Sequence, residues 1–136
     1  MKHLKRFNEA IDWECVNIIK DILLELEDMD INIYFTGPGM RSEKWTPQFG
    51  AYKKARGEYM YEIMGNPICK HFLEWDDIKD CILRLKNYIG GNFISFSYIK
   101  YSLPFTGFFQ SEPTFIHINN NTKITDKILT FRILFM

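Results

Sequence analysis

The chain has 136 residues, of which 46% are hydrophobic and 25% charged, and this composition excludes an intrinsically disordered protein. A chain of this length builds one hydrophobic core, so we expect a single domain over residues 1–136. The formal net charge is zero, which argues against a dedicated nucleic-acid-binding protein because such proteins carry a positive excess.

Residues 8–28 have the pattern of an amphipathic helix, and Asn8 suits its N-cap. Apolar side chains recur three and four positions apart and form one stripe along it, made up of Ile11, Cys15, Ile18, Ile19, Ile22, Leu23 and Leu26. Polar and charged residues occupy most of the other positions. The sequence therefore predicts a helix that packs one face on the core.

An acidic cluster closes this helix, formed by Glu25, Glu27, Asp28 and Asp30. Negative charge at the C-terminus of a helix opposes the helix dipole and costs roughly a few tenths of a kcal/mol. The cluster is either a solvated helix end or a binding surface that is kept at this local cost.

The alternation in residues 31–36 predicts a strand, and Gly37-Pro38-Gly39 ends it in a turn. Residues 40–55 have no clean period, which predicts a long loop with at most one short element inside. A second strand is expected over residues 59–64, before Gly65-Asn66-Pro67.

Basic and aromatic residues are interspersed between positions 41 and 61. The candidates for partner contact in this segment are Arg41, Lys44, Trp45, Tyr52 and Arg56. Such a mixture suits a protein interface, where Trp, Tyr and Arg are enriched, or a surface that stacks nucleobases. It equally suits a loop whose aromatic side chains fold onto the core.

Every local signal in residues 75–88 agrees on a second helix. Its apolar face is Trp75, Ile78, Ile82, Leu85 and Ile89. Asp76 and Asp77 favour the N-terminus, basic residues occupy the last turn, and Gly90-Gly91 stops the helix. Asp76, Asp77 and Asp80 form a second acidic set, which we count among the candidate partner-binding residues.

Three further strands are expected, over residues 93–101, 114–118 and 128–135, with a turn at Asn119-Asn120-Asn121. The strand 128–135 is too apolar to be solvated, so it pairs in the chain's own sheet or with a second copy, as a homodimer.

The order of elements is helix, strand, strand, helix, strand, strand, strand. Consecutive strands joined by short connections pair antiparallel. We therefore expect an α+β fold, with a mostly antiparallel sheet of four to five strands and two main helices packed on one face.

The chain carries no recognisable catalytic signature. Its three histidines and three cysteines lack the close pairs of a zinc site, and Gly37-Pro38-Gly39 lacks the Lys-Ser/Thr of a phosphate-binding loop. We expect no cofactor, no metal and no enzymatic activity.

The expected location is the cytoplasm. No apolar signal core follows the basic start of the chain, and no run approaches the ~20 apolar residues of a membrane span. Cys15, Cys69 and Cys81 are odd in number and widely spaced, which indicates a reducing compartment.

The size, the α+β order and the helix Trp75-Asp76-Asp77-Ile78-Lys79-Asp80-Cys81-Ile82-Leu83-Arg84-Leu85-Lys86-Asn87-Tyr88 feeding a β-rich end resemble the small immunity proteins encoded beside bacterial polymorphic and contact-dependent toxins. The resemblance implies a cytoplasmic protein that binds a cognate toxin domain and blocks its active site or substrate path. On this hypothesis the two acidic sets meet a basic, nuclease-type toxin through complementary charge.

The alternative hypothesis is a small RNA-binding or ribonuclease-like protein that uses residues 41–61. Arg56 would then clamp a phosphate, and Glu58 and His117 would act as an acid–base pair.

Overall fold

The computed structural model describes residues 13–47, 57–65, 72–89, 94–101 and 112–136. Its elements in chain order are α2 (Trp13–Asp28), β1 (Asn32–Thr36), β2 (Glu43–Lys44), β3 (Tyr59–Met64), α3 (Trp75–Tyr88), β4 (Ile94–Lys100), β5 (Thr114–Ile116) and β6 (Ile128–Phe135).

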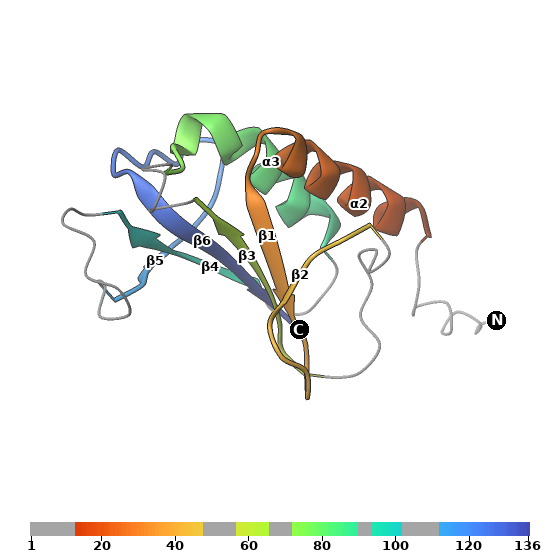
Figure 1. Ribbon diagram of the computed structural model, residues 1–136. Coiled ribbons are helices and arrows are strands. Elements are labelled where there is room, and N and C mark those ends of the chain that lie inside the picture. The colour runs from red at the N-terminus through yellow and green to blue at the C-terminus, as the bar shows by residue number, and fades with distance from the viewer. Residues whose placement is uncertain (1–12, 48–56, 66–71, 90–93, 102–111) are drawn as a thin grey trace.

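The strands form one sheet in the order β2-β1-β3-β6-β4-β5, and every neighbouring pair is antiparallel. Both helices lie on the same face of this sheet (Figure 1). The predicted α+β architecture is therefore confirmed. The sheet has six strands instead of four to five because β2 is a two-residue strand inside the segment expected to be a loop.

Strand β6 occupies the middle of the sheet. One of its edges pairs with β3, from Tyr59 opposite Phe135 to Met64 opposite Thr130, and its other edge pairs with β4. Because both edges are hydrogen-bonded within the chain's own sheet, this strand has no edge to offer a second copy. Of the two arrangements expected for this strand, pairing within the chain's own sheet is the one observed.

The core lies between the sheet and the helices, and strand alternation decides which side chains reach it. A row of paired positions across the sheet, Ile33, Ile63, Phe131 and Tyr98, faces the helices and is buried. Aromatic rings meet there: Phe131 stacks on Trp75 of α3 with ring centroids 5.8 Å apart. Burial raises the pKa of the Tyr61 phenol.

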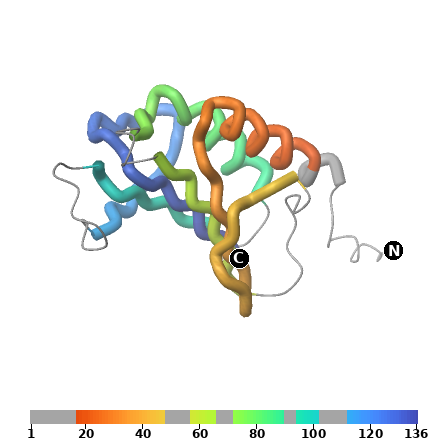
Figure 2. Tube along the Cα trace, viewed as in Figure 1, coloured from red at the N-terminus to blue at the C-terminus, as the bar shows by residue number. Residues whose placement is uncertain are grey.

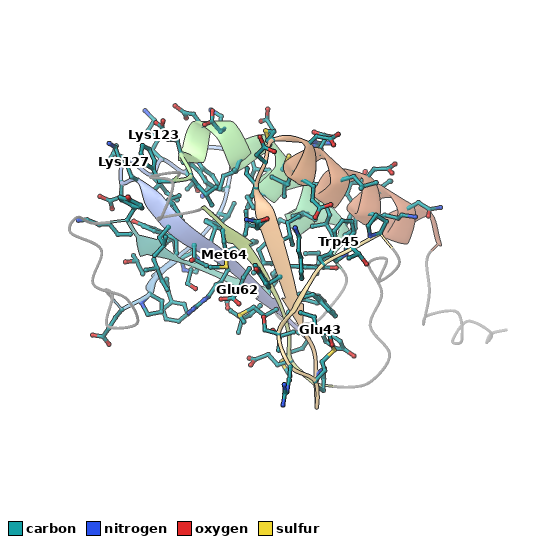
Figure 3. The ribbon with its side chains drawn as sticks, in the orientation of Figure 1. Glu43, Trp45, Glu62, Met64, Lys123 and Lys127 are labelled. Atoms are coloured by element: carbon teal, nitrogen blue, oxygen red, sulfur yellow. The ribbon has the colours of Figure 1, made fainter. Side chains whose placement is uncertain are left out.

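The opposite face of the sheet carries a different row, in which each residue is the register partner of the next. It runs from Lys44 through Tyr34, Glu62, Arg132 and Ser97 to Phe115. In its centre Arg132 Nε donates to Glu62 Oε2 over 2.9 Å. Neither of the two described helices covers this face, on which Glu62 and Met64 extend from β3 (Figure 3).

The end of α2 is a Schellman motif. The Ile31 amide donates to the Leu26 carbonyl over 3.3 Å, and the Asp30 amide donates to the Glu27 carbonyl over 3.0 Å. This geometry requires a left-handed residue at the position usually held by glycine, and here Asp30 adopts a φ of 62°. Ile31 and Leu26 are both buried, so the turn leads the chain directly from α2 into β1.

Side chains of α3 tie this helix to the segment that follows β5. The Trp75 indole donates to the Thr122 carbonyl over 3.0 Å, and Lys86 Nζ donates to the Ile118 carbonyl. The predicted asparagine turn is present, since Asn119 Oδ1 accepts a hydrogen bond from the Asn121 amide over 2.7 Å. These contacts fix α3 relative to the sheet.

No described helix is long and apolar enough to cross a membrane.

Candidate partner-binding surface

Helices α2 and α3 lie side by side and run in opposite directions (Figure 2). Glu25 of α2 contacts Arg84 of α3, whereas Met29 and Ile31, just beyond α2, share a pocket with Asp77 near the start of α3. Residue numbers therefore rise along α2 as they fall along α3. The acidic end of α2 consequently lies beside the acidic beginning of α3.

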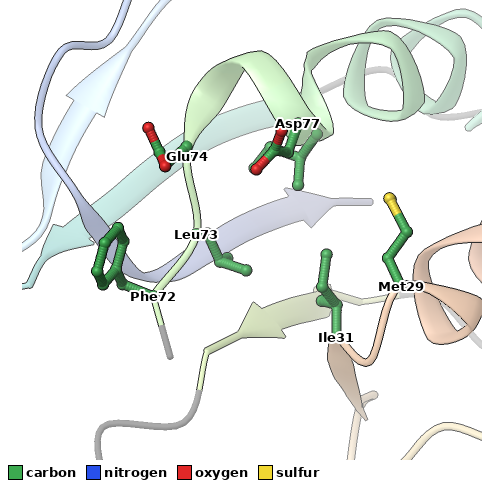
Figure 4. Close-up of a pocket in the computed structure, with 7 residues that line it drawn as sticks. Met29, Ile31, Phe72, Leu73, Glu74 and Asp77 are labelled. Atoms are coloured by element: carbon green, nitrogen blue, oxygen red, sulfur yellow. The ribbon is translucent and has the colours of Figure 1, made fainter. Parts of the chain in front are cut away.

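A pocket of about 90 Å³ opens where these two helix ends meet. Its lining comes from two segments far apart in the sequence, the α2–β1 junction and the segment leading into α3 (Figure 4). Five of the lining side chains are apolar and two are carboxylates, in the set Met29, Ile31, Phe72, Leu73, Glu74, Asp77 and Ile78. Met29 is 41% exposed.

Six exposed carboxylates gather on the helix ends that form this pocket. We refer to them as the acidic surface: Asp28, Asp30, Glu74, Asp76, Asp77 and Asp80. Within the described part of the chain, the ion pair that reaches this group joins Asp76 to Lys79 at 3.8 Å. A second lysine lies at the edge of this surface, because Lys127 Nζ is 4.4 Å from the ring centroid of the pocket-lining Phe72.

Several of these acids do not stabilise the helices that carry them. The last turn of α2 holds no basic residue, so its acids oppose the helix dipole. Asp30 adopts a left-handed conformation that glycine would adopt at lower cost. Glu74 is the N-cap of α3, yet its side chain makes no capping hydrogen bond. The neighbouring N-terminus of α3 offsets part of the cost, because its dipole favours negative charge.

Glu25 and Glu27 do not share one surface, because residues two apart on a helix point to nearly opposite sides. Glu25 faces α3, where its Oε1 accepts a hydrogen bond from Arg84 Nη2 over 2.7 Å. This bond lowers the pKa of the Glu25 carboxyl. Glu27 lies on the other side of α2 and is half-buried. Of the four predicted acids of this segment, Asp28 and Asp30 belong to the acidic surface.

The basic and aromatic segment does not form the surface that its sequence suggested. Trp45 is fully buried in the core, so the expectation that it contacts a partner is corrected. Arg41 and Lys44 are exposed, and Lys44 Nζ donates to Asn32 Oδ1 over 3.3 Å. Lys44 thus reaches the first residue of β1, which directly follows the pocket-lining Ile31. Tyr52 and Arg56 lie outside the described residues.

The acid–base pair proposed for RNA cleavage is not assembled. Glu58 precedes β3 and His117 follows β5, and strands β6 and β4 lie between them. Three strand spacings separate them by about 14 Å, well beyond the reach of a hydrogen bond. Tyr59 and Tyr61 of the same segment are buried in the core. Among the described residues, no group of three or more His, Cys, Asp or Glu side chains could hold a metal ion.

Cys81 contacts the same interhelical pair, with its Sγ 3.8 Å from Glu25 Oε1 and 3.6 Å from Arg84 Nη2. The thiol is buried, and burial raises its pKa, so the reactive thiolate is disfavoured. Cys81 thus acts as a small core residue.

Sequence reasoning missed Glu74 and Met29, which complete the pocket. A usable signal existed for Glu74, since an acidic residue directly before a helix adds to the charge of its first turn. Met29 stands between acidic neighbours and interrupts a charged stretch.

Comparisons of the chain with protein-family models, curated proteins and solved structures find no match.

Proposed function

We propose that this chain is a cytoplasmic, non-enzymatic protein-binding module of the immunity type. It binds a cognate bacterial toxin domain through the acidic surface and thereby covers the active site or substrate path of the toxin. The observation that carries the proposal is the meeting of two acidic sets, one at the end of α2 and one at the start of α3, around a single pocket.

The charge of the acidic surface indicates the chemistry of the partner. A nuclease-type toxin carries a basic groove that neutralises phosphates, and six exposed carboxylates complement such a groove. Complementary potentials raise the association rate and select against partners of the wrong sign. The local cost of the α2 acids and of Asp30 supports a role in binding, because these residues do not favour the helix end on which they lie.

Binding of the purified product of the neighbouring gene tests the proposal, by surface plasmon resonance at low and at moderate salt. The test variant is Asp28→Asn/Asp76→Asn/Asp80→Asn, and its matched control is Glu43→Gln/Glu58→Gln/Glu112→Gln. Both triple variants remove three exposed carboxylates, and only the first removes them from the acidic surface.

We expect the test variant to weaken binding by at least about tenfold, mainly through slower association, and the control to change it by less than about threefold. Raising the salt concentration should reduce the difference between the two variants, since screening shortens the range of the charges. Absence of any complex of micromolar affinity or tighter would refute the proposal.

A further inference from the structure

The pocket combines a fixed apolar floor with a charged rim. Ile31, Leu73 and Ile78 are almost fully buried and form the floor. Glu74 and Asp77 are exposed and stand at the rim (Figure 4). Met29 lines one side, and its unbranched, adaptable side chain can move to fit an occupant. An occupant therefore needs an apolar portion and a cationic end.

The size of the pocket narrows the occupant further. The pocket has a volume of about 90 Å³. An apolar cavity that accepts benzene measures about 150 Å³, so an aromatic side chain does not fit. The straight stem of three or four methylenes in Arg or Lys matches the space, and such stems lie along apolar surfaces while their charged ends stay in water.

The carboxylates at the rim are available for a cation. Glu74 makes no side-chain capping bond, and within the described ranges no ion pair joins Glu74 or Asp77 to a basic side chain. Phe72, at the other end of the lining, already has Lys127 Nζ at 4.4 Å from its ring centroid. A second cation is thus favoured near Glu74 and Asp77, away from Lys127.

We infer that this pocket is the anchor site for an arginine side chain of the partner protein. The inference rests on the proposed function and names the group that the toxin inserts. Arginine suits the site better than lysine because its weakly hydrated guanidinium pairs with carboxylates in a planar fork. Arginine is also enriched among the few residues that dominate the affinity of protein interfaces.

The first test uses N-acetyl-arginine amide as the probe and N-acetyl-citrulline amide as the neutral probe of nearly the same shape. Each is titrated into isotope-labelled protein while amide chemical shifts are recorded. We expect the arginine probe to shift the amides of Ile31, Leu73 and Ile78 in the millimolar range, and the citrulline probe to leave them unchanged. Equal shifts from the two probes, or arginine shifts spread over all exposed acids, would overturn the inference.

The second test uses the complex with the toxin candidate. Glu74→Gln/Asp77→Asn removes both rim charges, and Asp76→Asn/Asp80→Asn removes the same charge from the acidic surface outside the pocket. We expect the first variant to lose at least about tenfold more affinity than the second, through faster dissociation. Equal losses would show that the surface acts only by its total charge.

A charge-neutral variant separates filling of the pocket from electrostatics. Met29→Trp adds bulk at the pocket wall, and the exposure of Met29 allows this change without disturbing the core. It should weaken both the arginine probe and the toxin by at least about fivefold, and unchanged binding would exclude insertion. If no toxin complex forms at all, the proposed function fails, while the arginine titration still decides whether the pocket takes a guanidinium.

Discussion

The interior and the acidic surface of this protein have opposite effects on the free energy of the folded state. In the interior, side chains such as Ile33, Ile63 and Phe131 are fully buried, and each lowers the free energy of the folded state by leaving water. On the acidic surface, residues such as Asp28 and Asp30 raise that free energy through the helix dipole and a left-handed backbone. The interior therefore accounts for the stability of the fold. The acids of the surface do not add to that stability, and their presence is explained by binding.

Replacing Trp45 gives the largest expected effect on the interior side of this comparison. Trp45→Ala removes a fully buried ring and should lower the free energy of unfolding by about 3–5 kcal/mol. The matched control is Phe115→Ala, at a ring that is 70% exposed, which should cost less than about 0.5 kcal/mol. Urea denaturation followed by circular dichroism measures both. Similar losses at the two sites would contradict the burial of Trp45.

Glu62 sharpens the comparison because it is an acid with a stabilising partner. Its carboxylate and Arg132 are 15% and 30% exposed and lie 2.9 Å apart. A double-mutant cycle with Glu62→Gln and Arg132→Met should give a coupling free energy of about 1 kcal/mol, between the values for exposed and buried pairs. Coupling close to zero in urea denaturation would show that cross-strand pairing does not hold this face of the sheet.

Asp30 is the residue at which stability and binding should separate most clearly. Asp30→Gly relieves the left-handed conformation and removes a charge that opposes the dipole of α2. We expect thermal denaturation to show a gain of about 0.5–1 kcal/mol, while affinity for the toxin candidate falls. A loss of stability in this variant would mean that the Asp30 side chain supports the fold, and the contrast between interior and surface would then be incorrect here.

Glu25 should give the smallest effect, and one that depends on pH. The hydrogen bond from Arg84 holds the pKa of Glu25 below the ordinary value of a glutamate. The pair therefore stabilises the fold above that ordinary value, and its contribution is lost as pH falls through the lowered pKa. Because the Glu25 side chain is 54% exposed, Glu25→Gln should cost no more than about 0.5 kcal/mol at pH 7.

Denaturation of both proteins at pH 7 and pH 3 measures this difference, which should shrink at the lower pH. Arg84→Gln should reproduce the same pH dependence. A difference that grows on acidification would require Glu25 to be stabilised in its protonated form.

Local pattern was sufficient to predict the elements of the fold. The second helix is found over Trp75–Tyr88, where apolar spacing, first-turn acids and a glycine stop all agreed. The strand expected at residues 31–36 is observed as Asn32–Thr36. These outcomes depend on residues within one turn or one strand of each other, which is the range that a pattern reports.

Strand order and the pocket depended on contacts that no local pattern reports. The apolar character of residues 128–135 showed that the strand must pair, but its place between β3 and β4 follows from register along two other strands. Trp45 was counted with its basic neighbours, although its amide donates to the Ile33 carbonyl over 2.8 Å and its ring enters the core. The meeting of Met29 and Asp77 in one pocket required the antiparallel packing of two helices.

The central position of β6 also determines when the sheet can form during translation. Until Ile128–Phe135 has left the ribosome, β3 and β4 each lack the neighbour that joins the two halves of the sheet. Helices and hairpins can form earlier in the nascent chain, but the sheet closes only after almost all of the described sequence has been synthesised. A chain cut short before this strand would therefore leave β3 and β4 without their common neighbour.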